Sequence, residues 1–174
     1  HMEVNIASSD PLNIPGEIIA KGINVMQGYY KNEEATQMVI DQDGWFHTGD
    51  LATMSADGHI FIRGRIKNIL LGSNGQNIFP EEIEDKLNSM TMVNESLVIQ
   101  NGNKLIGLVH PDMDEAEALG CSVQELQDVM EQNRKELNGL LPSYCKLASI
   151  KLHETEFEKT PKKSIKRYLY KNIV

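Results

Sequence analysis

The sequence predicts an α+β fold, in which a small β-rich subdomain precedes a compact α+β domain with a three-stranded, mostly antiparallel sheet and flanking helices. Residues 51–65 and 95–110 each read as two strands around a short glycine turn. Apolar side chains recur at helical spacing over residues 126–137, which predicts the main helix. We place the domain boundary at Arg65 and so expect domains over 3–64 and 65–174.

Local patterns justify the elements of the β-rich part. Residues 3–15 are polar and turn-rich and read as irregular, whereas residues 16–22 alternate weakly and read as a strand. Asn32 is suited to cap a short helix whose first turn holds two glutamates. The turn at residues 56–58 has hairpin chemistry, so it is expected to join two strands of one sheet.

The second part is expected to alternate strands and helices. Pro80, followed by two glutamates, predicts the start of a helix. Ser122 and Glu125 form a capping box for a longer helix, which Gly139 is predicted to end. Residues 150–153 read as the third strand of the sheet.

Composition is that of a soluble globular protein, with 40% hydrophobic and 24% charged residues in a chain of 174. No apolar run is long enough to span a bilayer, and the start of the chain lacks a signal-peptide pattern. His1-Met2 reads as a cloning remnant. Cys121 and Cys145 have no CxxC spacing or metal-ligand companions, so we expect a reducing, cytoplasmic location and no metal site.

Charge is unevenly distributed, because a net charge of −8 coexists with a basic tail. Residues 159–171 hold six lysines and arginines and no acidic residue, and residues 164–172 are predicted to form a basic helix. An acidic body argues against broad nucleic-acid binding, so a nucleic-acid binder acting through the tail is a weak alternative. A local site for phosphates stays open.

Few residues suggest chemistry by themselves. Asp50 follows a turn and could accept the two hydroxyls of a ribose, while Arg65 could donate to the same sugar or to a phosphate. A turn-stabilising aspartate and a solvated arginine are the commoner interpretations. The glycine loop 72–76 could approach a ligand, although it lacks a P-loop lysine and most such loops are surface turns. His47 is expected to be a structural histidine.

Five motifs occur in a fixed order: GEIIAKGINVMQGYYKNEEAT, GWFHTGDLATMSADGHIFIRGRIKN, NGQNIFPEEIE, LPSYCKL and EKTPKKSIKR. Together they resemble the C-terminal third of acyl-adenylate-forming enzymes, a family of acyl-CoA synthetases, peptide-synthetase adenylation domains and luciferases. The resemblance runs from about Pro15 to the end. LLGSNGQNIFPEEIE and KTPKKSIKRYLY look most like bacterial long-chain fatty acid–CoA ligases.

The resemblance implies a two-step reaction, in which ATP first forms an acyl-AMP and the thiol of coenzyme A then displaces AMP. It also implies a small C-terminal lid that rotates between the steps. The family's phosphate-binding loop and its Mg²⁺-ATP motif are missing here, so we expect a fragment that is inactive alone. Its main partner would be the missing N-terminal domain, with fatty acid, ATP and coenzyme A as substrates and Mg²⁺ held upstream.

The resemblance also assigns roles to residues. Asp50 and Arg65 would contact the ribose of ATP or AMP, Ile62 would lie near the adenine, and Lys67 would be the hinge. The loop that would line the pantetheine channel for coenzyme A consists of Gly72, Ser73, Asn74, Gly75 and Gln76.

The tail departs from the family pattern at one position. The family often reads TPSGKIxR, and its lysine stabilises charge during adenylation, but here Ser164 occupies the place of that lysine. We expect Lys163 to replace it, with Lys162 and Lys166 as weaker candidates. The alternative to a ligase fragment is a freestanding, non-enzymatic module that binds an adenine nucleotide or coenzyme A.

Overall fold

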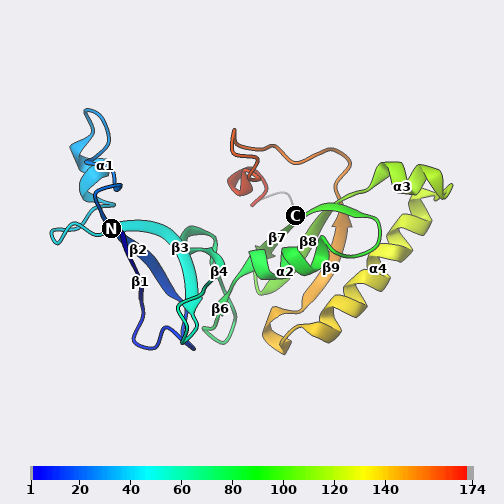
Figure 1. Cartoon of the computed structure of the whole chain (residues 1–174). Coiled ribbons are helices and arrows are strands. Elements are labelled where there is room, and N and C mark those ends of the chain that lie inside the picture. Colours follow the sequence, from blue (N-terminus) through cyan, green and yellow to red (C-terminus); the bar gives the residue numbers. More distant parts are fainter. Residues whose placement is uncertain (1, 172–174) are drawn as a thin grey trace. The chain divides into compact units, whose positions relative to one another are not determined.

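The computed structural model describes residues 2–171, and the chain divides into two compact units, His1–Ile69 and Leu70–Val174 (Figure 1). This division falls a few residues after the boundary expected at Arg65. Arg65 ends a strand that pairs with Asp50, and the 3₁₀ turn η1 (Ile66–Asn68) follows it directly within the first unit. Each unit has its own sheet.

The first unit is an antiparallel sheet of four strands in the order β1 (Met2–Ala7), β2 (Gly16–Gly22), β3 (Phe46–Met54) and β4 (Ile60–Arg65). Strand β1 corrects the prediction that residues 3–15 are irregular, since it pairs with β2 from Met2↔Gly22 to Ala7↔Glu17. Residues 2–6 do alternate between apolar and polar side chains, but the strand is short and lies directly before a turn-rich stretch, so its signal is weak.

Two local predictions for this unit are confirmed. Helix α1 (Glu33–Gln37) is capped by Asn32, whose side-chain oxygen accepts a hydrogen bond from the Ala35 amide at 3.0 Å. The hairpin between β3 and β4 turns at Gly58, which has a φ of +86° that a glycine adopts without strain.

The second unit is a mixed α+β domain, which confirms the predicted fold class. Its central sheet has the order β7 (Val93–Asn101), β8 (Lys104–Pro111) and β9 (Leu147–Leu152). Strands β7 and β8 are antiparallel, whereas β8 and β9 are parallel because α3 (Met113–Ala118) and α4 (Val123–Leu140) form the crossover between them. A small hairpin of β5 (Leu70–Leu71) and β6 (Asn77–Ile78) precedes helix α2 (Pro80–Leu87).

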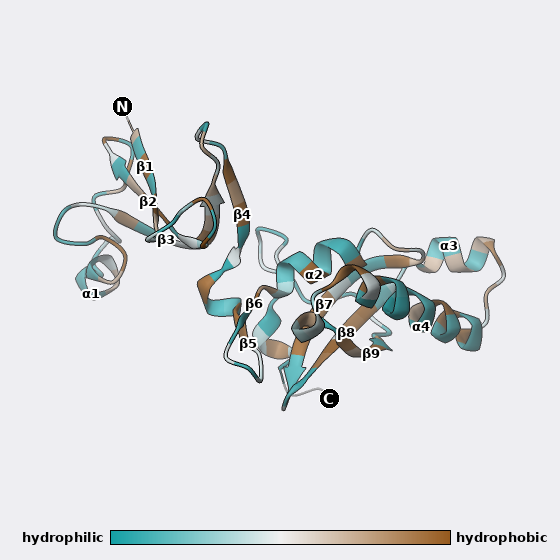
Figure 2. Cartoon of the chain, turned by 90° about the horizontal axis from the view of Figure 1, so that it is seen from below, coloured by the Kyte–Doolittle hydropathy of each residue, from teal (hydrophilic) through white to brown (hydrophobic). Residues whose placement is uncertain are grey.

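Both faces of this central sheet are covered. Helices α2 and α4 pack on one face, where Leu87, Leu137 and Val109 belong to one buried cluster. The C-terminal segment covers the other face, where Phe157 and Tyr170 pack with alternate residues of β7 and β8. Figure 2 shows apolar colouring concentrated along these strands. The strands therefore bury side chains on both sides.

Two predicted helix features in this unit are wrong, although the Ser122–Glu125 capping box is confirmed. Helix α4 does not end at Gly139 but continues to Leu140, and Leu141 leaves the helical region because Pro142 follows it. The basic tail is no helix. The prediction covered residues 164–172, of which residue 172 lies outside the described residues; over 164–171 the chain forms the 3₁₀ turn η3 (Arg167–Leu169), after a reversal at Lys163, which has a φ of +62°.

The segments before and after α4 include short elements that were not predicted. Helix α3 begins at Asp112, whose side chain accepts a hydrogen bond from the Glu115 amide, and the 3₁₀ turn η2 (Ser143–Cys145) connects α4 to β9. Within residues 2–171, no helix combines the length and the apolar character that crossing a bilayer requires.

Candidate functional site

Asp50 and Arg65 meet where the β3–β4 ladder ends. They are direct partners across the two strands, and Arg65 Nε lies 2.9 Å from Asp50 Oδ1. Arg65 Nη2 also donates to the Thr48 carbonyl at 2.9 Å. Because both side chains are exposed, the pair contributes little to stability. It does hold a carboxylate and a guanidinium side by side on the surface, where they can reach polar groups of a ligand.

Glu17 of β2 holds the turn that carries Asp50. Its Oε1 accepts a hydrogen bond from the Gly49 amide at 2.8 Å, and Gly49 has a φ of +75°, so a glycine suits this position. Thr48 Oγ1 accepts from the Asp50 amide and donates to the Ile18 carbonyl. No local sequence pattern marks Glu17, because its role depends on the β2–β3 pairing.

His47 also contacts Glu17. Its Nδ1 is 2.7 Å from Glu17 Oε2, and its Nε2 is 3.5 Å from Asp41 Oδ2. The hydrogen bond to Glu17 raises the pKa of the His47 imidazole above its ordinary value. The Trp45 amide, more than His47, lowers the pKa of the Asp41 carboxyl. His47 is therefore a structural, hydrogen-bonded histidine, as expected.

Ile62 and Lys67 lie on either side of Arg65 in the chain. Ile62 is 72% exposed on β4, which gives that strand an apolar surface a few residues from the ion pair, and the strand is brown in Figure 2. Such a surface suits the face of a flat ring. Lys67 lies within η1, shortly before the division between the two units. Its role as a hinge stays a prediction.

The glycine loop 72–76 is the tip of the β5–β6 hairpin. The Gly72 amide donates to the Gln76 carbonyl, and the Gly75 amide donates to the Gly72 carbonyl. Asn74 bonds Gln76 through both its amide oxygen and its amide nitrogen, whereas Ser73 is exposed. Since the loop satisfies many of its own polar groups, its backbone can stay ordered in solvent without a ligand.

Lys163 sits at the turn of a short hairpin in the tail. Lys159 and Ile165 form an isolated bridge, the Thr160 amide donates to the Ser164 carbonyl, and the Lys163 amide donates to the Thr160 carbonyl. The left-handed conformation of Lys163 closes this turn. The family pattern TPSGKIxR has a glycine at the same place, which fits that backbone conformation.

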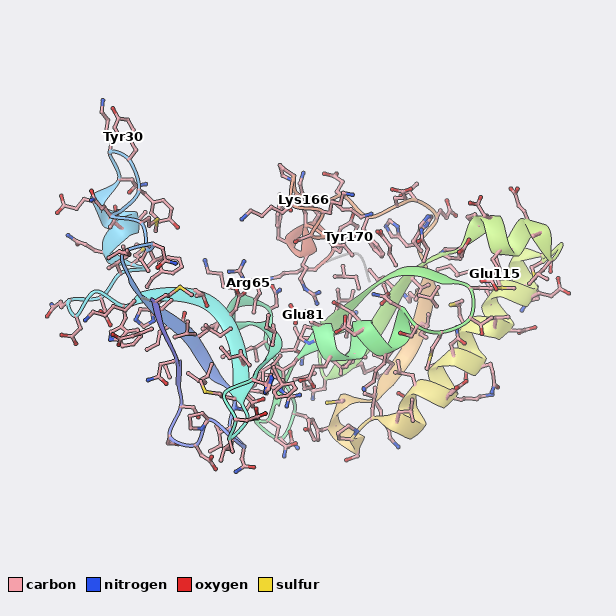
Figure 3. All side chains as sticks on the ribbon, in the orientation of Figure 1. Tyr30, Arg65, Glu81, Glu115, Lys166 and Tyr170 are labelled. Atoms are coloured by element: carbon pink, nitrogen blue, oxygen red, sulfur yellow. The ribbon has the colours of Figure 1, made fainter. Side chains whose placement is uncertain are left out.

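The tail lysines differ in their partners. Lys159 forms an ion pair with Glu95, and Lys166 Nζ lies 3.1 Å from Glu158 Oε2. Over residues 2–171, no ion pair involves Lys162 or Lys163, and both are exposed. Figure 3 shows Lys166 together with Tyr170 on the C-terminal segment. The lysines free to meet a ligand anion are therefore those of the turn.

The second unit identifies the family. Residues 67–172 match the model of the AMP-binding enzyme C-terminal domain, which is more than half of the chain. The chain belongs to this family. This match confirms the broader part of the resemblance, which is the C-terminal domain of AMP-binding enzymes.

Relatives of this AMP-binding domain act on different acids by name. A 2-succinylbenzoate–CoA ligase of Bacillus cytotoxicus is 40% identical over 99 residues, which are 57% of this chain and 20% of that protein. The long-chain-fatty-acid–CoA ligase FadD15 of Mycobacterium tuberculosis is 37% identical over 92 residues, 53% of this chain and 15% of that protein. The matches span a fifth or less of these relatives.

A solved structure shares the fold. The O-succinylbenzoate coenzyme A synthetase MenE of Bacillus subtilis, in complex with AMP, aligns with a TM-score of 0.71 at 24% identity. The alignment covers 98% of this chain and 34% of that one. This likeness shows the mixed α+β fold.

Proposed function

We propose that this chain is the C-terminal part of an ATP-dependent fatty acid–CoA ligase of the bacterial long-chain class. Residues 3–64 would be the last β-rich subdomain of a large adenylating domain, and residues 65–174 a cytoplasmic mobile lid that turns about Lys67. The parent would convert acid, ATP and coenzyme A into acyl-CoA, AMP and diphosphate. The chain alone would be inactive, because the acid pocket belongs to the missing part.

The Asp50–Arg65 pair carries this proposal. A carboxylate with one oxygen held by Arg65 Nε keeps lone pairs for the two hydroxyls of a ribose, and Arg65 orients it. Ile62 supplies apolar surface for the adenine. The Gly72–Gln76 tip would face the pantetheine arm of coenzyme A after lid rotation, since it offers ordered backbone without bulky side chains.

Adenylation needs a positive charge near the α-phosphate, and we assign it to Lys163. The Ser164 hydroxyl cannot supply a charge, while Lys159 and Lys166 are already held by glutamates. Among the described residues, no group of three His, Cys, Asp or Glu side chains could hold a metal ion. By the resemblance, the Mg²⁺ that accompanies ATP would be held by residues of the parent's N-terminal domain.

The first test is ATP–pyrophosphate exchange with a panel of fatty acids, on this chain and on its full open reading frame. Exchange in the parent with long-chain acids, and none in this chain, is the expected result. A parent that prefers aromatic or short acids would overturn the long-chain assignment. No exchange in either protein, with AMP or coenzyme A still bound, would favour the non-enzymatic binding module.

The second test separates the turn lysines in the parent enzyme. Lys163→Ala should slow pyrophosphate exchange about a hundredfold, because it removes charge stabilisation at the reacting phosphate. Lys162→Ala, one residue away in the same turn, is the matched control and should change the rate by less than about threefold. Unchanged exchange in Lys163→Ala would show that another group supplies the charge.

A further inference from the structure

The C-terminal segment is fastened to the rest of the second unit by a buried ion pair. Arg167 Nη1 lies 2.8 Å from both Glu84 Oε1 and Glu84 Oε2, across 83 residues of sequence. The side chains are 18% and 10% exposed, so solvent screens the pair weakly. Glu84 belongs to α2, and Arg167 begins η3.

The pair also forms hydrogen bonds with backbone groups of the edge strand β7. Val98 lies in β7 and is paired with Gly107 of β8. Strand β8 is the only neighbour of β7 in the described sheet. The Val98 amide donates to Glu84 Oε1 at 2.6 Å, and Arg167 Nη2 donates to the Val98 carbonyl at 2.9 Å. Both polar groups that Val98 presents at the free edge are thus taken by one ion pair, as a partner strand would take them.

The two side chains come from opposite faces of the sheet. Ile83 and Leu87 of α2 pack into the cluster on one face, while Phe157 and Tyr170 of the tail pack into the cluster on the other face. Figure 3 shows Tyr170 on the tail and Glu81 near the start of α2. The ion pair therefore joins the two layers around the edge of β7.

Stability alone does not explain a charged pair at this place. Burial raises the pKa of the Glu84 carboxyl, and the hydrogen bonds from Arg167 oppose that rise. Apolar side chains of similar size often stabilise a buried site as well as an ion pair does. What this pair adds is direction, since Nη1 of the guanidinium donates to both carboxylate oxygens while Nη2 donates to the Val98 carbonyl, and few geometries satisfy all three contacts.

We propose that Glu84 and Arg167 are a positioning pair, which fixes the tail on the β7 edge and thereby sets the placement of the Lys163 turn. Arg167 follows Lys163 by four residues, and the Lys159–Glu95 ion pair holds the other side of the same turn. The hydroxyl of Tyr170 adds a third tie by accepting from the Glu158 amide at 2.7 Å. The turn is fastened on both sides and moves with the second unit.

Neither residue of the pair needs to touch substrate for this role. The consequence for adenylation rests on the function proposed above for Lys163, whereas the fixing of the tail does not. The two parts therefore have separate readouts, one in this chain and one in the parent enzyme.

Hydrogen exchange by NMR on the 174-residue chain tests the fixing of the tail. In Glu84→Gln and Arg167→Lys, the amides of Thr160, Lys163 and Lys166 should exchange about tenfold faster or more, because the tail opens locally. Amides of β8 should keep their protection. Glu131→Gln, which weakens the exposed pair with Arg134 in α4, is the matched control and should leave tail exchange unchanged.

Unchanged tail exchange in both variants would overturn the proposal. An equal rise in exchange over tail and sheet would overturn it as well, because the pair would then serve stability alone. If Glu84→Gln does not fold, Arg167→Lys, which keeps the positive charge, decides the question in the same measurement.

The parent enzyme gives the second readout. Arg167→Lys should lower the kcat of pyrophosphate exchange about tenfold or more while the KM for ATP stays within about twofold, because a displaced turn harms the reacting geometry and not ground-state binding. Faster tail exchange with an unchanged kcat would leave the pair as the fastening of the tail and would instead overturn the role of Lys163 in adenylation.

Discussion

Each of the two units of this chain is stabilised internally by different interactions. Between Met2 and Ile69, the buried apolar side chains are Ile6, Leu51 and Ala52, and large apolar residues such as Ile23 and Tyr30 are exposed. The second unit buries two apolar clusters, one on each face of its sheet. The first unit is therefore a hydrogen-bonded frame, meaning a sheet with few buried apolar side chains. The second unit is a domain with a well-packed apolar core.

This difference predicts which substitutions will destabilise each unit. A packed domain loses stability when a buried side chain is shortened, because a cavity remains. A hydrogen-bonded frame depends instead on backbone geometry and on a few polar side chains, such as Glu17 and Thr48. Trp45 is the single tryptophan and lies in the first unit, so its fluorescence can follow that unit separately.

The largest expected effect sharpens the contrast in packing. Leu87→Ala removes a fully buried side chain between α2 and the sheet and should lower the free energy of unfolding of the second unit by about 2–5 kcal/mol. Guanidinium unfolding followed by circular dichroism measures it. Leu71→Ala, at a side chain 61% exposed, should cost less than about 0.5 kcal/mol. An equal shift in Trp45 fluorescence would show that the units unfold together.

A backbone change should weaken the first unit instead. A Cβ added at Gly16 would lie 2.4 Å from the Ala7 carbonyl oxygen, and this contact is with backbone that cannot rotate away. Gly16→Ala should therefore lower the stability of the first unit by about 1–3 kcal/mol, seen as an earlier transition of Trp45 fluorescence. A transition at the wild-type midpoint would mean that the chain between β1 and β2 adapts freely.

The same substitution should have the opposite sign in the second unit. Gly139 lies inside α4, its φ is ordinary, and no heavy atom lies within 4 Å of an added Cβ. Gly139→Ala should raise the stability of the second unit by about 0.5–1 kcal/mol, because alanine loses less conformational entropy in a helix. Thermal unfolding followed by circular dichroism checks this, and a lower midpoint would contradict the α4 boundary at Leu140.

The smallest expected effect is a pH dependence of the stability of the first unit, which arises at His47. Glu17 raises the pKa of His47, so the folded state binds the proton more tightly than the unfolded state does. The resulting stabilisation is complete below the unfolded pKa of about 6.5 and is lost as pH rises through the higher folded pKa. The Trp45 transition should therefore weaken from about pH 6 to pH 8.

His47→Gln is the control for that measurement and should flatten the slope, because the amide does not titrate. A slope that persists in His47→Gln would assign the pH dependence to another group. The effect should be modest, since His47 is 36% exposed and solvent screens its partners.

Strong local signals made much of the structure predictable. The Asn32 cap, the Ser122–Glu125 capping box and the Gly58 hairpin were all predicted, because each depends on residues a few positions apart. The candidate site was partly predictable for the same reason. Asp50 and Arg65 were singled out separately, and the β3–β4 register then made them partners.

Two of the errors arose where long-range contacts outweighed local preference. Strand β1 has an alternating pattern over residues 2–6, but a run this short becomes a strand only through its pairing with β2. The lysine-rich tail has helical composition, but Phe157 and Tyr170 gain more by packing on the sheet than a short exposed helix could gain. Lys163 closes a turn directly before the residues of the predicted helix.

By itself, the sequence determined the α+β class, the capped helices, the hairpins and the separate residues of a nucleotide site, because periodicity and turn chemistry act over a few residues. The tertiary structure decided which of these residues meet. It brought Glu17 to Gly49, Asp50 to Arg65, and Glu84 to Arg167. A partner 83 residues away is selected by strand pairing and burial, which no local pattern encodes.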